Sequence, residues 1–82
     1  MGKKATDYSV NTVEFGKRVR LIRKEKGISV KEMSDFFGMY PQTIYKWERG
    51  TAFPDVDNLL ALSSYLEVSI DYLLTGRLFF AA

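Results

Sequence analysis

Short apolar stripes with helical spacing follow one another along this chain, and no stretch alternates apolar and polar residues as a strand does. Over residues 13–26, Phe15, Val19 and Ile22 recur at intervals of three and four residues, and Gly27 then ends the pattern. This spacing predicts a first helix with one buried face.

The stretch 27–50 predicts two further helices that are separated by a three-residue turn. Ser29 is a natural N-cap, and Glu32 three residues later completes a capping box at the start of the second helix. Pro41 suits the first position of a third helix, which we expect over 41–49. Two short helices joined in this way are typical of a helix-turn-helix.

Two more helices are predicted in the last third of the chain. Asp55 caps the fourth helix, and Ser69 caps a short fifth helix that ends at Gly76. The fourth helix is expected to have a broad buried face made of Val56, Leu59, Leu62, Ser63 and Leu66. The whole pattern predicts an all-α fold, a compact five-helix bundle.

The segments outside these helices differ in character. Residues 1–12 are polar and lack periodicity, so we expect a flexible basic arm before a single domain over 13–76. Residues 77–82 form an apolar tail, which is a dimerisation element, a segment packed on the domain, or an extension left by cloning.

The third helix has two unlike faces, because Ile44 and Trp47 project to the side opposite its polar residues. The polar face consists of Gln42, Tyr45, Lys46 and Arg49. Such a face is typical of a solvated helix surface, and equally of a helix that lies in the major groove of DNA.

Composition narrows the possible chemistry. The chain has no cysteine and no histidine, which excludes thiolate nucleophiles, imidazole bases and the usual zinc ligands. It also lacks a glycine-rich phosphate loop and an apolar run long enough to span a membrane. We therefore expect a cytoplasmic protein that is not an enzyme and that needs no metal or cofactor.

The net charge is only +2, but it is unevenly distributed. Residues 1–50 hold eleven Lys and Arg against six acidic residues, whereas residues 51–82 hold one Arg against four acidic residues. The basic density is greatest over 17–26. The first half is therefore the candidate surface for a polyanion, although a solvated helix face has the same composition.

Four segments together resemble the Cro and phage-repressor helix-turn-helix family, also called the XRE family. They are Phe15-Gly16 leading to Arg23, Gly27-Ile28-Ser29, Ile44-Tyr45-Lys46-Trp47-Glu48-Arg49-Gly50, and Pro54 followed by residues 66–74. The resemblance covers roughly residues 15–76. It implies a lambda-repressor-like domain of five helices that binds double-stranded DNA, commonly as a symmetric dimer.

The resemblance also implies roles for individual residues. The base-contact positions would be Tyr40, Pro41, Gln42, Tyr45 and Lys46. Phosphate contacts would come from Ser29, Thr43 and Arg49, and a structural ion pair would join Arg23 and Glu48. Gln42 matches the hydrogen-bonding edge of adenine, and Lys46 that of guanine.

Three departures from the family pattern affect these expectations. Pro41 stands where many members have a small residue early in the third helix, so a base contact there would have to be apolar. Val30 stands where many members have a glutamine that can bind phosphate, and its side chain cannot form a hydrogen bond. Glu67 stands where many members have glycine after the fourth helix. That position implies either a strained left-handed residue or a modified turn.

The leading hypothesis is a DNA-binding transcriptional repressor, bacterial or phage-encoded, that acts as a homodimer on an inverted repeat. The alternative is an antitoxin-like subunit that acts mainly through contacts with a small regulatory protein partner. The surface for a dimer or such a partner would include Ile70, Tyr72, Leu78, Phe79 and Phe80.

Overall fold

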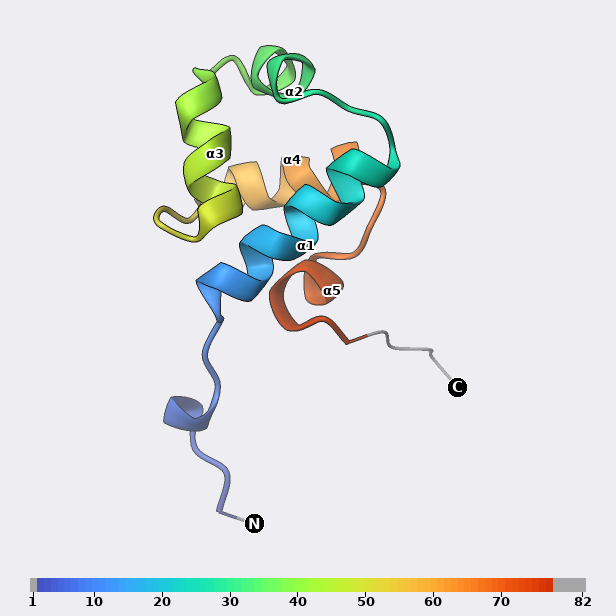
Figure 1. Cartoon of the computed structure of the whole chain (residues 1–82). Coiled ribbons are helices and arrows are strands. Elements are labelled where there is room, and N and C mark those ends of the chain that lie inside the picture. The colour runs from blue at the N-terminus through green and yellow to red at the C-terminus, as the bar shows by residue number, and fades with distance from the viewer. Residues whose placement is uncertain (1, 78–82) are drawn as a thin grey trace.

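The computed structural model describes residues 2–77 (Figure 1). Within this range the chain is helical and contains no strand, so the predicted all-α fold with five α-helices is confirmed. The elements are η1 (Ala5–Asp7), α1 (Thr12–Glu25), α2 (Val30–Phe37), α3 (Pro41–Arg49), α4 (Val56–Leu66) and α5 (Ile70–Thr75). No helix in residues 2–77 combines the length and apolarity needed to cross a membrane.

Side-chain caps set the beginnings of most helices. The predicted caps Ser29, Asp55 and Ser69 each accept a hydrogen bond from a backbone N–H three residues later. Asn11 does the same for α1, so this helix begins at Thr12, one residue earlier than the apolar stripe indicated. The residues before α1 are exposed and extend away from the bundle (Figure 1).

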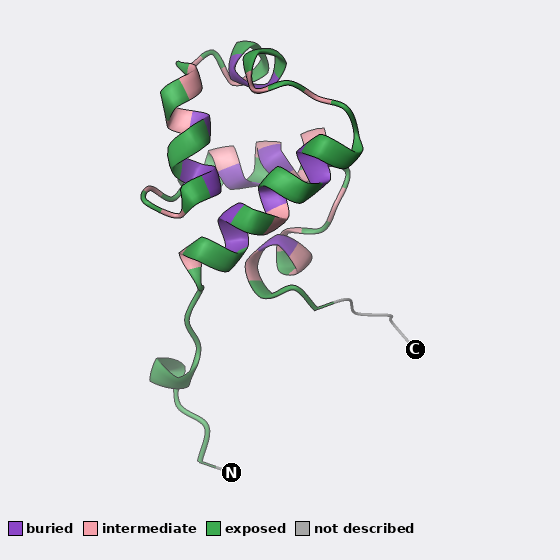
Figure 2. Cartoon of the chain, in the orientation of Figure 1, coloured by how far each residue is buried: buried purple, intermediate pink, exposed green. Residues whose placement is uncertain are grey.

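One continuous apolar core lies between the helices, and the buried residues face inward (Figure 2). All three residues of the first predicted stripe belong to it. Its full membership is Phe15, Val19, Ile22, Met33, Ile44, Trp47, Leu59, Leu62, Leu66 and Leu73. Val56 was wrongly assigned to the buried face of α4: it is 80% exposed, because it opens the helix where no other element covers it.

Helices α1 and α3 approach each other closely at Gly16. A Cβ atom at this position would lie 2.5 Å from the Trp47 carbonyl oxygen and would also overlap the Glu48 carbonyl. At the same C-terminal end of α3, the Thr12 hydroxyl donates a hydrogen bond of 3.1 Å to the Gly50 carbonyl. The backbones of the two helices therefore lie in close contact, and only glycine can occupy the crossing point.

A buried ion pair joins the same two helices. Arg23 Nε lies 2.6 Å from Glu48 Oε2, and Arg23 Nη2 donates to Glu48 Oε1 over 3.1 Å. The two side chains are only 8% and 4% exposed. The hydrogen bond to Glu48 raises the pKa of Arg23 further above its ordinary value, so the guanidinium stays charged. Its Nη1 also donates to the Ile28 carbonyl, which anchors the α1–α2 connection.

In the turn after α4, Glu67 adopts the left-handed conformation. This was one of the two alternatives that the sequence left open at this position. Glu67 has φ 58° and ψ 44°, and it is the only non-glycine residue in 2–77 with positive φ. A left-handed residue with a Cβ costs about 1–2 kcal/mol. The Glu67 carboxylate lies 3.2 Å from Lys26 Nζ, an exposed ion pair that offsets only part of this cost.

We expect Gly16→Ala to destabilise the protein, although the same change in an open helix usually adds stability. The added methyl group must push α1 away from α3, and overpacking of this kind costs about 1–3 kcal/mol. Urea denaturation measures the free energy of unfolding. Lys17→Ala, at an exposed position on the same helix, serves as the control. A Gly16→Ala protein as stable as the wild type would contradict the close approach.

We expect Glu48→Ala to lower the free energy of unfolding by about 3–5 kcal/mol, because it leaves the Arg23 guanidinium buried without its partner. Replacing both residues together, with Arg23→Met and Glu48→Leu, should recover much of the loss. Glu14→Ala breaks an exposed pair with Lys17 and should cost at most about 1 kcal/mol. Equal losses in the Glu48→Ala and Glu14→Ala proteins, measured by urea denaturation, would show that burial adds nothing to the pair.

Candidate nucleic-acid interface

Helix α3 is held firmly against the rest of the domain. Gly38 ends α2 in the left-handed conformation with φ 65°, and Tyr40 is the extended residue before Pro41 opens α3. The Phe37 and Trp47 rings then meet edge to face, with centroids 5.4 Å apart. These contacts fix the direction of α3 relative to α2.

The outer face of α3 is polar and accessible. Ile44 and Trp47 are buried, as the helical spacing predicted, whereas Gln42, Lys46 and Arg49 are exposed. Tyr40 and Tyr45 are 79% and 47% exposed, which leaves large aromatic surfaces uncovered. The half-buried residues of this region are Pro41 and Thr43.

These side chains carry hydrogen-bonding groups of the kind that match base edges. The Gln42 amide both donates and accepts hydrogen bonds, and the Lys46 ammonium donates only. Neither Lys46 nor Arg49 forms an ion pair with another residue in 2–77. Both cations are therefore available to an external partner.

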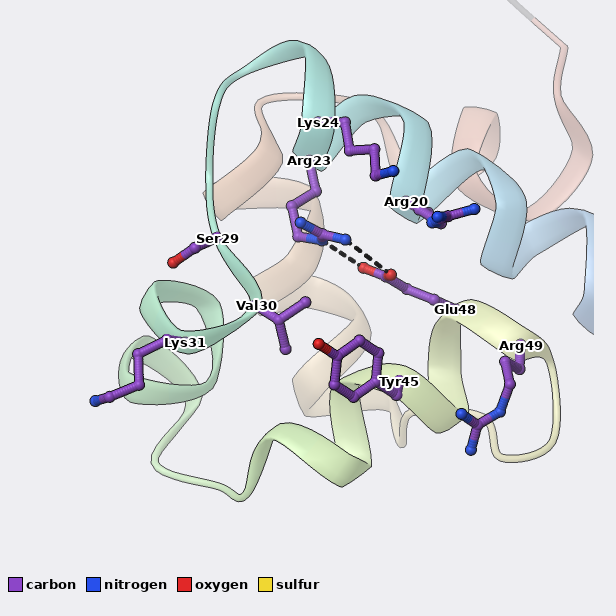
Figure 3. Close-up of a pocket in the computed structure, with 9 residues that line it drawn as sticks. All are labelled: Arg20, Arg23, Lys24, Ser29, Val30, Lys31, Tyr45, Glu48 and Arg49. Carbon is purple, nitrogen blue, oxygen red and sulfur yellow. Dashed lines mark hydrogen bonds and ion pairs between the residues drawn. The ribbon is translucent and has the colours of Figure 1, made fainter.

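A basic groove of about 720 Å³ adjoins this face (Figure 3). Helix α1 forms one wall, α3 forms the other, and the start of α2 closes one end. The lining residues are Arg20, Arg23, Lys24, Ser29, Val30, Lys31, Tyr45, Glu48 and Arg49. Five of these are cationic and one is acidic, so the groove favours an anion.

The start of α2 offers further donors to this groove. Ser29 accepts from the Glu32 N–H, and the Glu32 carboxylate accepts from the Ser29 N–H, which forms the predicted capping box. The backbone N–H groups of Val30 and Lys31 donate to no residue in 2–77. Such unsatisfied groups at a helix start are suited to a phosphate oxygen.

Only some of the contact residues predicted from the sequence lie together in the structure. Tyr45, Arg49 and Ser29 come together around the basic groove, in which the Arg23–Glu48 pair lies between α1 and α3 (Figure 3). Arg20 and Lys24 also line it, although no role was assigned to them individually. Their signal in the sequence was the basic density over 17–26 and their spacing of four residues.

The suggested partner surface at the C-terminus is less exposed than expected. Ile70 and Tyr72 are half-buried and pack against the core. Leu78, Phe79 and Phe80 lie outside the described residues. Within residues 2–77 no group of His, Cys, Asp and Glu is arranged to hold a metal ion.

The chain matches known proteins over most of its length. A helix-turn-helix family model matches residues 19–73. The prophage-derived HTH-type transcriptional regulator YonR of Bacillus subtilis is 45% identical over 62 residues, which cover 76% of this chain and 57% of that protein. Repressor protein C2 of Salmonella phage P22 is 41% identical over 69 residues, 84% of this chain and 32% of that protein. The chain thus spans about half or less of the length of these relatives.

Solved structures have the same fold. The P22 c2 repressor in complex with a synthetic operator superposes with a TM-score of 0.72 and 40% identity, over 77% of this chain and 96% of that chain. The biofilm regulator SinR in complex with DNA has a TM-score of 0.65 and 33% identity, over 73% of this chain and 97% of that chain. These proteins are transcription regulators and not enzymes. Together with the family match, they show that the chain belongs to the XRE-type helix-turn-helix family.

Proposed function

We propose that this protein regulates transcription by binding a specific double-stranded DNA sequence, with α3 lying in the major groove. The observation that carries this proposal is the exposed polar face of α3, whose opposite face is locked into the core. A helix with a fixed backbone presents its side chains to base edges without the cost of ordering that backbone on binding. The related c2 repressor in complex with a synthetic operator and SinR in complex with DNA support double-stranded DNA as the partner.

Base contacts would come from the first two turns of α3 and the residue before it. Gln42 can form paired hydrogen bonds with adenine N6 and N7, and Lys46 can donate to guanine O6 or N7. The exposed rings of Tyr40 and Tyr45 offer apolar surface to a thymine methyl group. Pro41 adds an apolar contact only, since it has no polar side-chain atom.

Phosphate contacts would position α3 without reading sequence. Ser29 lies at the start of α2, and Thr43 and Arg49 lie on α3. Ser29 and Arg49 line the basic groove together with Tyr45. Contacts of this type set register and orientation on the duplex. Because base contacts affect sequence preference and phosphate contacts do not, substitutions on α3 can distinguish the two roles.

The protein would act as a homodimeric repressor on an inverted repeat. A two-fold symmetric pair of domains places two copies of α3 in successive major grooves, about 34–36 Å or ~10 bp apart. One relative, the C2 protein of phage P22, is itself named a repressor, which supports repression as the direction of control.

Base-contact and phosphate-contact variants should differ in selectivity. Gln42→Ala or Lys46→Ala should cost about 1–3 kcal/mol of binding free energy on the preferred site and relax preference at one position per half-site. Arg49→Ala should weaken binding to all duplexes alike and reduce the salt dependence. Fluorescence anisotropy with single-base operator variants measures both effects. Uniform losses across all sequences for the three variants would refute α3 as the reading element.

Selection from a random duplex library at about 0.15 M salt should enrich an inverted repeat with half-sites ~10 bp apart. Sedimentation of the complex with the enriched duplex should give two protomers per site. An enriched single half-site bound by one protomer would contradict the dimer. If DNA is retained but no sequence motif is enriched, the protein binds DNA only through non-specific electrostatic attraction.

A further inference from the structure

The two exposed tyrosines at the outer face of α3 differ in how far other residues cover them. Tyr40, the residue before α3, is 79% exposed, whereas Tyr45 in the middle of α3 is 47% exposed. Tyr45 also lines the basic groove between α1, α3 and the start of α2. Part of the Tyr45 ring is therefore covered by the walls of this groove, while most of the Tyr40 ring is in contact with solvent.

The Tyr45 ring is directed toward α2. Figure 3 shows the ring extending from α3 toward the start of α2, with its hydroxyl end toward Val30. The pKa of Arg23 agrees with this direction, because it is raised by the hydrogen bond to Glu48 and, to a smaller degree, by the nearby Tyr45 phenol. The hydroxyl group of Tyr45 thus lies on the groove side of its ring, and the rest of the ring borders the outer face of α3.

Val30 supplies an apolar surface at the place toward which this ring is directed. It is the first residue of α2, it is half-buried, and it packs against the apolar core. Its side chain lines the same groove as Tyr45 and has no polar atom. A β-branched side chain has few accessible rotamers, and the contact with the core restricts them further. Val30 is therefore a fixed surface against which a ring can rest.

We propose that Val30 is a positioning residue for base recognition: it packs on the Tyr45 ring and holds it in one orientation, so that Tyr45 reads a thymine methyl group through its ring and not through its hydroxyl. The inference rests on the proposed function, since it assumes that α3 lies in the major groove, where the thymine methyl group is exposed. A ring that is held before binding loses little rotamer freedom on meeting a base, whereas a free ring must first be ordered. Tyr40 is largely uncovered and should contribute less to base preference.

Nuclear magnetic resonance of the free protein tests the contact without DNA. Nuclear Overhauser cross-peaks are expected between the Val30 methyl protons and the Tyr45 ring protons. The ring should also shift the Val30 methyl signals, and Tyr45→Ala should remove this shift. Tyr40→Ala is the matched control and should leave the Val30 signals unchanged. Absence of the cross-peaks in the wild type would overturn the proposal.

Replacing single thymines with deoxyuridine tests the role in recognition, because the two bases differ by one methyl group. Each thymine in one half-site of the duplex enriched from the random library is replaced in turn, and fluorescence anisotropy measures the affinity. At one position the wild type should bind the deoxyuridine duplex about 4-fold less tightly, the size expected for one buried methyl group. The Val30→Ala protein should bind the two duplexes alike at that position. Full discrimination in the Val30→Ala protein would overturn the positioning role.

Further variants separate positioning from a general effect on the fold. Val30→Thr keeps the branched shape and should keep the discrimination. Tyr45→Phe removes only the hydroxyl and should also keep it, whereas Tyr45→Ala should abolish it. Val56→Ala, which shortens an 80% exposed valine on α4, should change nothing. Urea denaturation confirms that all variants are folded, and loss of the discrimination in the Tyr45→Phe protein would overturn the assignment to the ring.

Failure of the proposed function has a different signature from failure of this inference. If α3 does not read DNA, the wild type binds the enriched, deoxyuridine and scrambled duplexes equally, although the cross-peaks between Val30 and Tyr45 are present. If α3 reads DNA without the help of Val30, the enriched duplex is preferred over the scrambled one, but no thymine shows a methyl effect that depends on Val30. The same set of anisotropy measurements gives both answers.

Discussion

The close packing of α1 against α3 is the constraint on which the rest of the molecule depends. At Gly16 the backbones approach so closely that a single methyl group would overlap two carbonyl groups of α3. Nearby, the buried Arg23–Glu48 pair ties the same helices through charge-assisted hydrogen bonds. A buried ion pair contributes less to stability than to geometry, because desolvation offsets much of its attraction. Its role here is to hold α3 at one angle and depth.

That constraint also shapes the surface. Because α3 is fixed by Ile44 and Trp47 on its inner face, its outer face keeps one orientation, which a reading element needs. Arg23 and Glu48 cancel each other in the groove that the two helices enclose, so the unpaired cations around them dominate its potential. The Arg23–Glu48 ion pair thus contributes both to the packing of α1 against α3 and to the electrostatic potential of the groove.

Most of the fold could be predicted because its signals are local. Ser29, Asp55 and Ser69 begin helices in the structure as their side-chain chemistry predicts, since a cap acts only on backbone groups a few residues away. Val56 shows the limit of periodicity, which identifies a helix face but not where the neighbouring helices end. The conformation of Glu67 likewise had two alternatives until the structure placed it in the left-handed region.

The sequence by itself determined the five helices, the helix-turn-helix and the two-faced character of α3, because these follow from side-chain spacing and capping within single segments. Only the tertiary structure decided which basic residues share a surface. Arg20 and Lys24 lie in a stretch with four other cations, and nothing local distinguishes them from Lys17 or Lys26. They line the groove with Arg49 because of the way α1 crosses α3, a geometry set by contacts between residues far apart in the chain.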